Sequence, residues 1–157
     1  MVSDMRYKRV VFCSGDGTYR SPVAAAVLKK CFEQDEELKN IDICAKGMIV
    51  MFPEPVNGKA VAIGKSKGYN LSEYSAQGIT RDDFSIETLV LVMTDMGKKK
   101  VYDAYDNAIN VYTIKEFIGA AGDIDIPFGK GLADYGENFN QLESLIKQVA
   151  DKLIKIK

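Results

Sequence analysis

The sequence predicts an α/β fold in which a four-stranded parallel sheet lies between two layers of helices. Segments with strand-like and helix-like periodicity alternate along the chain, as parallel strands joined by crossover helices require. Residues 88–93 form a continuous apolar run, which is typical of a parallel strand buried on both faces. Residues 132–153 repeat apolar side chains at helical spacing, which predicts a long helix with one buried face.

The first half of the chain contains two predicted strands, each followed by a predicted helix. Residues 10–13 are the first strand and residues 41–45 the second. Residues 55–67 have helical spacing and end before Gly68, a suitable C-terminal cap. The helix predicted over residues 22–32 has one apolar face, formed by Val23, Val27, Leu28, Cys31 and Phe32.

The second half of the chain predicts two further strands and the last helix. Residues 88–93 are the third strand and residues 110–113 a short fourth one. A loop with several glycines follows, over residues 119–131. The buried stripe expected on the last helix consists of Leu132, Tyr135, Phe139, Leu142, Leu145, Ile146, Val149 and Leu153.

Length, composition and charge narrow the class of protein. The chain has 157 residues, of which 46% are hydrophobic, so we expect residues 1–157 to form a single domain. A net charge of −1 argues against nucleic acid as a partner, because binding to a phosphate backbone needs a basic excess. No apolar run is long enough for a signal peptide or a bilayer span, which predicts a cytoplasmic protein without a membrane partner.

The cysteines predict neither a disulfide framework nor a metal centre. Cys13, Cys31 and Cys44 are few and scattered, and the chain has no histidine. We therefore expect no metal or other cofactor, and we expect Cys31 and Cys44 to be small buried residues.

The stretch VVFCSGDGTYRSP at residues 10–22 reads as a strand, an anion-binding loop and the start of a helix. Gly15 and Gly17 allow backbone conformations in which successive N–H groups point toward one position. Arg20 adds a planar set of donors for two phosphate oxygens. Ser21 and Pro22 are expected to be the N-cap and first residue of the helix, whose positive end would face the same position.

This loop therefore predicts a phosphate site. Walker-type loops end in Gly-Lys-Ser or Gly-Lys-Thr, and dinucleotide-binding folds need three spaced glycines; neither pattern is present. The expected phosphate-binding residues are Ser14, Gly15, Asp16, Gly17, Thr18, Tyr19, Arg20 and Ser21.

The same stretch resembles the low-molecular-weight protein-tyrosine phosphatase family, whose loop runs Cys, five residues, Arg, Ser, Pro at the end of the first strand. The resemblance covers most of the chain and implies the fold of that family. It implies hydrolysis of a phosphorylated protein or a small phosphomonoester, with inorganic phosphate or sulfate bound in the same loop.

The position of the family's nucleophile can be assigned in two ways. Counting back from Arg20 with the family spacing places Ser14 at this position and leaves Cys13 in the core. Alternatively, Cys13 begins a loop expanded by one residue and is the nucleophile. A thiolate in such a loop is activated by converging N–H groups and by the arginine, whereas a serine hydroxyl needs a general base. With no histidine in the chain, Ser14 is expected to bind phosphate without attacking it.

A second part of the resemblance lies before the last helix. The family carries Asp-Pro, an aromatic residue and glycine there, and this aspartate protonates the leaving oxygen. Residues 123–129 resemble that loop, but Ile126 stands at the place of the acid. Asp125 remains a candidate acid, whereas Asp123 is expected to be a solvated loop carboxylate.

Other positions in the resemblance concern the ligand. A threonine at the place of Thr18 occurs in the arginine-phosphate-cleaving branch of the family, so phosphoarginine is considered beside phosphotyrosine. Tyr19 replaces the family's second cysteine. Phe52, Tyr74 and Phe128 are candidate aromatic walls for a flat side chain beside the phosphate.

Two functional hypotheses follow. The first is a phosphatase of phosphotyrosine or phosphoarginine, with Cys13 as nucleophile, Arg20 as phosphate ligand and Asp125 as acid. The second is a catalytically impaired phosphate-binding module of the same fold, with Ser14 in an intact loop.

Overall fold

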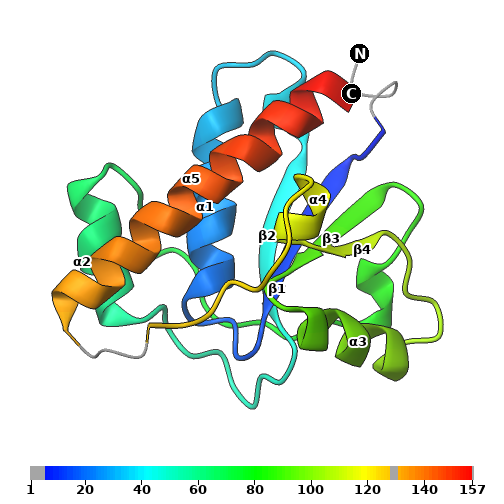
Figure 1. Cartoon of the computed structure of the whole chain (residues 1–157), viewed down its shortest axis with the longest axis horizontal. Helices are drawn as coiled ribbons and strands as arrows, with labels where there is room; N and C mark the ends of the chain where they lie inside the picture. Colours follow the sequence, from blue (N-terminus) through cyan, green and yellow to red (C-terminus); the bar gives the residue numbers. More distant parts are fainter. Residues whose placement is uncertain (1–5, 128–130, 157) are drawn as a thin grey trace.

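A computed structural model of the chain, which describes residues 6–127 and 131–156, confirms the predicted parallel sheet (Figure 1). The strand order is β2-β1-β3-β4, and all neighbouring pairs are parallel. The strands are β1 (Arg9–Ser14), β2 (Asp42–Gly47), β3 (Thr88–Val92) and β4 (Val111–Thr113). The α-helices are α1 (Arg20–Phe32), α2 (Gly58–Ser66), α3 (Asp95–Ala104), α4 (Ile114–Phe117) and α5 (Leu132–Ile156), and the 3₁₀ turns are η2 (Leu38–Asn40) and η3 (Arg81–Asp83).

Side chains of the central strand β1 alternate between two hydrophobic cores. Val10 and Phe12 belong to the larger core, which contains the buried faces of α1 and α5. Val11 and Cys13 belong to the smaller core, together with Val101 of α3. Helices therefore cover both faces of the sheet, as the sequence predicts, and Figure 1 shows α5 lying across α1.

The parallel register brings three loops to the same edge of the sheet. Ser14 at the end of β1 pairs with Gly47 at the end of β2, and Cys13 pairs with Val92 at the end of β3. Because all strands run in one direction, the segments that follow them leave from one edge. The functional site is expected at this edge.

The start of α1 differs from the prediction. The helix begins at Arg20, with Tyr19 as its N-cap residue and no side-chain capping bond, so Ser21 is not the N-cap. Its hydroxyl is instead hydrogen-bonded to that of Ser14. The helix α2 also begins later than predicted, at Gly58, because the side chain of Asn57 accepts the N–H of Lys59 and caps the helix there.

Two residues predicted to be buried are exposed. Leu132 is 57% exposed at the first residue of α5, where the helix has not yet reached the core. Cys31 is exposed in the last turn of α1, next to charged α5 residues that include Lys147 and Asp151. The prediction of a buried Cys31 is therefore wrong, and Cys44 is half-buried.

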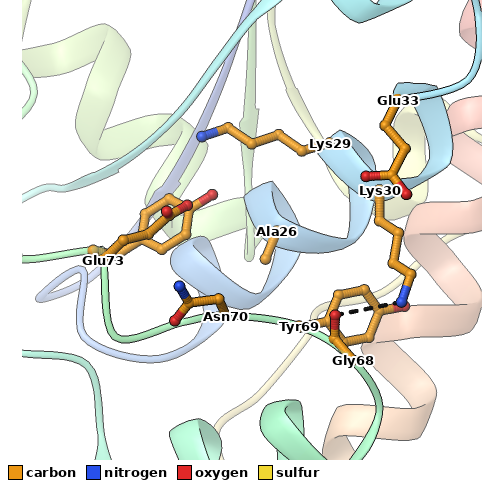
Figure 2. Close-up of a pocket in the computed structure, with 9 residues that line it drawn as sticks. Ala26, Lys29, Lys30, Glu33, Gly68, Tyr69, Asn70 and Glu73 are labelled. Atoms are coloured by element: carbon orange, nitrogen blue, oxygen red, sulfur yellow. Dashed lines mark hydrogen bonds between the residues drawn. The ribbon is translucent and has the colours of Figure 1, made fainter.

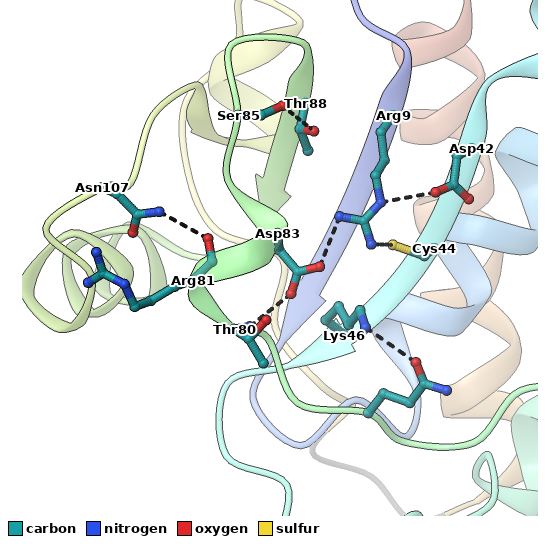
Figure 3. A network of polar contacts seen from close by, with 11 residues as sticks. Arg9, Asp42, Cys44, Lys46, Thr80, Arg81, Asp83, Ser85, Thr88 and Asn107 are labelled. Atoms are coloured by element: carbon teal, nitrogen blue, oxygen red, sulfur yellow. Dashed lines mark hydrogen bonds and ion pairs between the residues drawn. The ribbon is translucent and has the colours of Figure 1, made fainter.

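Arg9, at the first residue of β1, connects this strand to β2 and η3 (Figure 3). Its guanidinium donates to Asp42 of β2 at 3.0 Å, to Asp83 of η3 at 2.9 Å and to the sulfur of Cys44 at 3.2 Å. Asp83 is buried and also accepts the backbone N–H of Thr80. This network holds η3 against the sheet.

Candidate phosphate-binding site

Residues 14–20 form a compact loop between β1 and α1. Gly17 has φ +76°, a backbone conformation that favours glycine. A Cβ added to Gly47 would lie 2.7 Å from the carbonyl carbon of Asp16, so only glycine at the end of β2 permits this close approach. The backbone N–H of Met48 donates to the Ser14 carbonyl at 2.8 Å. The segment after β2 therefore supports the outer side of the loop.

Ser14 lies at the base of the loop. Its side chain is 4% exposed, and its Oγ lies 2.8 Å from the Oγ of Ser21 in the first turn of α1. Because Ser21 belongs to α1, the Ser14 hydroxyl must point toward the N-terminus of that helix. A group bound there would meet the positive end of the helix dipole.

Cys13 faces the other side of the sheet. Its side chain is 1% exposed and packs in the core under α3, together with Val11 and Val92. Burial raises the pKa of the Cys13 thiol to about 12, so the neutral thiol is the stable form. The structure thus places Ser14, rather than Cys13, on the α1 side of the strand.

Arg20 connects the loop to the segment before α5. Its Nη1 donates to the carbonyl oxygen of Ile124 at 2.7 Å. Its Nη2 lies beside Gly15, at 3.9 Å from the position that a Cβ atom on this glycine would take. Burial lowers the pKa of Arg20, while the carboxylates of Asp16 and Asp125 act in the opposite direction. The guanidinium stays charged, since an arginine begins far above neutral pH.

Asp16 forms hydrogen bonds with another residue of the loop. Its Oδ1 accepts the backbone N–H of Thr18 at 3.0 Å and the Thr18 hydroxyl at 2.9 Å. One backbone donor of the loop is therefore paired with a carboxylate of the loop itself. The Thr18 carbonyl accepts the N–H of Asn57, which ties the loop to the start of α2.

Tyr19 connects the loop to α5. Its hydroxyl donates to Oδ1 of Asn138 at 2.7 Å, and the Asn138 amide donates to the carbonyl oxygen of Asp125 at 3.0 Å. Burial raises the pKa of the Tyr19 hydroxyl, so it remains a donor. Sequence reasoning missed both Asn138 and Ile124, because neither contributes a side-chain pattern that identifies it as a partner of the loop.

The segment before α5 brings one of the two aspartates near Arg20. Asp123 accepts the backbone N–H of Asp95 at the start of α3, at 2.9 Å, and so helps to cap that helix. Asp125 is exposed, and its carboxylate lies close enough to Arg20 to favour the charged guanidinium. Ile126, which the sequence resemblance places at the position of the family's acid, is 56% exposed.

Of the three candidate aromatic walls, the structure describes Phe52 and Tyr74, which lie in different surroundings. Phe52 is 62% exposed on the segment after β2, and Phe128 lies outside the described residues. Tyr74 is half-buried and packs under Lys29, whose Nζ lies 4.9 Å from its ring centre. It borders a pocket of about 220 Å³ between α1 and residues 68–74, which none of the loop residues lines (Figure 2).

A larger groove adjoins the loop on the side of α3. It has a volume of about 600 Å³, and Gly15 and Asp16 form one wall. Met48, Ile49 and Tyr105 contribute apolar surface to it. Neither Arg20 nor Ser21 lines this groove.

Metal and membrane features are absent from residues 6–127 and 131–156. There, no cluster of three or more cysteine, aspartate or glutamate side chains is arranged to hold a metal ion. Likewise, none of the helices described combines the length and apolar character needed to cross a membrane.

Comparisons with known proteins agree with this fold. The chain is 30% identical to a protein-arginine-phosphatase of Geobacillus stearothermophilus over 95% of this chain and 97% of that protein. A crystal structure of a low-molecular-weight protein tyrosine phosphatase from T. tengcongensis superposes with a TM-score of 0.84 at 27% identity, covering 92% of this chain and 98% of that one.

A third relative carries a serine in its active site. It is a cysteine-to-serine mutant of the YwlE arginine phosphatase with a phosphorylated active-site serine, and it superposes with a TM-score of 0.83 at 27% identity, covering 94% of this chain and 96% of that one. The family model described as low molecular weight phosphotyrosine protein phosphatase matches residues 9–157. From its strand order, its loop and these matches, the chain belongs to the low-molecular-weight phosphotyrosine protein phosphatase family.

Proposed function

We propose that this chain is a phosphoryl-binding member of its family that lacks cysteine-based turnover. Its ligands are phosphorylated side chains of proteins, phosphotyrosine or phosphoarginine, and inorganic phosphate or sulfate. They bind in the loop formed by residues 14–21, to backbone N–H groups and to Arg20.

The observation that carries this proposal is the orientation of Cys13. Its thiol lies in the core under α3, on the other side of the sheet from the hydroxyl pair of Ser14 and Ser21. A thiolate nucleophile has to be both ionised and accessible, and Cys13 is neither. Ser14 takes the place of the nucleophile at the base of the loop.

The general-acid function that the family uses is weakened in this chain as well. Ile126 cannot donate a proton, and the backbone carbonyl rather than the carboxylate of Asp125 is held by Asn138. Among the described residues, Asp125 is the carboxylate of this segment that remains near Arg20 and can act as a weak substitute for the acid.

A second candidate function is transfer of the phosphoryl group of phosphoarginine onto Ser14. In this step the bond between phosphorus and the Ser14 oxygen forms, the phosphorus–nitrogen bond breaks, and the Ser14 proton ends on the departing guanidine nitrogen. The phosphorylated active-site serine in the YwlE mutant supports this possibility for a hydroxyl at such a position. In this chain the Ser21 hydroxyl can accept the Ser14 proton in a hydrogen bond and so orient the Ser14 oxygen. Phosphoserine would then accumulate, because hydrolysis needs an activated water molecule.

The phosphate site is tested by calorimetric titration of inorganic phosphate into the unmodified protein and two Arg20 variants. Arg20→Ala is expected to weaken binding by about 1.5–3 kcal/mol or more, which corresponds to a loss of roughly tenfold or greater. Arg20→Lys keeps the charge without the planar pair of donors and should have intermediate affinity. Equal phosphate affinity in all three proteins would refute the proposed site.

Turnover is tested with p-nitrophenyl phosphate and by mass spectrometry. The unmodified protein should hydrolyse this substrate at or near the background rate, and Cys13→Ser should not change that rate. Rapid hydrolysis that Cys13→Ser abolishes would overturn the proposal in favour of Cys13 as nucleophile. A protein that gains one phosphoryl group on Ser14 after incubation with phosphoarginine would establish the second candidate function.

A further inference from the structure

Asp16 introduces a negative charge into a loop built to bind a negative ligand. Its Oδ1 is hydrogen-bonded to the N–H and the hydroxyl of Thr18, at 3.0 and 2.9 Å. An incoming phosphate oxygen can use the Thr18 N–H only by displacing this carboxylate or by lying close to it. Either arrangement places two anionic groups within a few ångströms of each other.

The other charges around the loop do not neutralise Asp16 completely. Arg20 donates to the Ile124 carbonyl, while Asp125 follows on the same segment and is exposed. In the part of the chain that the structure describes, the loop and this facing segment thus combine one cation, Arg20, with three carboxylates, of which that of Asp123 caps α3. Lys100 and Asp103 line the adjacent groove with one charge of each sign, and Asp103 forms an ion pair with Lys99 at 2.8 Å.

A dianionic aryl phosphate and a phosphorylated guanidinium respond differently to this arrangement. Both present phosphoryl oxygens to the loop, but the guanidinium of phosphoarginine keeps a positive charge next to them. Repulsion by a nearby carboxylate depends on the net charge of the ligand. In phosphoarginine the positive guanidinium partly cancels this repulsion, whereas an aryl phosphate has no such group.

We propose, on the basis of the phosphoryl-binding function above, that Asp16 is a specificity-determining residue which disfavours dianionic phosphomonoesters. Its carboxylate makes the loop select ligands with a cation beside the phosphoryl group, of the phosphoguanidinium type. It also holds the Thr18 hydroxyl in a fixed direction at the entrance of the loop.

Asp16→Asn separates charge from loop structure, because the asparagine Oδ1 can still accept both hydrogen bonds from Thr18. Asp103→Asn, on the far wall of the groove, is the matched control. Affinities of all three proteins for a phosphotyrosine peptide, a phosphoarginine peptide and inorganic phosphate are measured at low and high salt.

The unmodified protein should bind the phosphoarginine peptide more tightly than the phosphotyrosine peptide. Asp16→Asn should raise the affinity for phosphotyrosine on the order of tenfold and that for phosphoarginine by less, so that the preference shrinks. High salt should reduce the preference of the unmodified protein, since exposed charges are screened. Asp103→Asn should leave the preference unchanged.

An unchanged ratio of the two affinities in Asp16→Asn, while both peptides still bind, would overturn this inference and leave the phosphoryl-binding function standing. A preference that does not respond to salt in the unmodified protein would also overturn it, independently of any variant. If none of the proteins binds inorganic phosphate, the proposed function itself is wrong, and this inference is refuted with it.

Discussion

The side-chain oxygens of Ser14 and Ser21 lie 2.8 Å apart, at the junction between β1 and α1. Both residues are buried, with exposed fractions of 4% and 0%. A group at position 14 is therefore held at the N-terminus of α1, the helix that begins with Arg20. This place would lower the pKa of a thiol, but it cannot ionise a serine hydroxyl.

Replacing Ser14 by cysteine is expected to create hydrolytic activity toward p-nitrophenyl phosphate. The helix N-terminus and Arg20 stabilise the thiolate, and the leaving group of this substrate needs little protonation. Adding Ile126→Asp should raise the rate toward phosphotyrosine further, since acid catalysis contributes about 10²–10⁴-fold. Steady-state rates of both variants check this, with Ile126→Asp alone as the control. If phosphate binds but neither variant is active, the loop geometry does not support the chemistry of the family.

Alkylation should distinguish Cys13 from Cys31. Because burial raises the pKa of Cys13 to about 12, its thiolate fraction stays very small until the pH approaches that value. Iodoacetate should therefore modify the exposed Cys31 of the native protein, faster at pH 9 than at pH 7, and leave Cys13 unmodified at both. Peptide mapping by mass spectrometry measures this, and the unfolded protein should react at both positions. Rapid modification of Cys13 that phosphate prevents would place its thiol in the loop.

Tyr19→Phe should loosen the connection between the loop and α5. It removes the 2.7 Å hydrogen bond to Asn138, which in turn holds the carbonyl of Asp125. We expect a loss of about 1 kcal/mol in the free energy of unfolding, together with weaker phosphate binding. Denaturant unfolding and titration measure the two effects. Tyr102→Phe, on the exposed surface of α3, is the control and should change neither.

Arg9→Met should destabilise the fold strongly. It leaves the buried carboxylate of Asp83 without its cation, and breaking a largely buried pair costs about 3 kcal/mol. Arg81→Met is the matched control, because Arg81 and Asp106 form a pair in which both side chains are largely exposed, and such pairs contribute about 0–1 kcal/mol. Unfolding by urea compares the two variants. Equal losses would show that Asp83 does not depend on Arg9 for its burial.

Local patterns in the sequence were sufficient for the fold class and for the position of the loop. Alternating strand and helix periodicity predicted the parallel sheet, because a crossover helix is what joins parallel strands. The glycines around Asp16, followed by Arg20, predicted an anion-binding loop, and Gly17 indeed adopts a positive φ. These properties depend on residues that are close to one another along the chain, and such local patterns can be read directly from the sequence.

Long-range contacts were decided by the tertiary structure alone. Arg20 meets Ile124 across 104 positions, and Tyr19 meets Asn138 across 119. Neither partner has a sequence pattern of its own, since a backbone carbonyl belongs to every residue and one amide on a helix is indistinguishable from others. The role of Ser21 could not be predicted for the same reason. Its hydroxyl could either cap α1 or bind to Ser14, and the sequence does not distinguish the two partners.

The sequence alone determined that a glycine-containing loop ending in Arg20 lies between the first strand and the first helix, and it predicted that this loop binds phosphate, while it left both Cys13 and Ser14 as candidates for the base of that loop. The tertiary structure decided which of the two faces α1. Side chains of a strand alternate between its faces, so the direction of each depends on where β1 ends against its neighbours and on which helix covers which face. Packing of Val11 and Cys13 under α3 turns the next side chain, that of Ser14, toward Ser21.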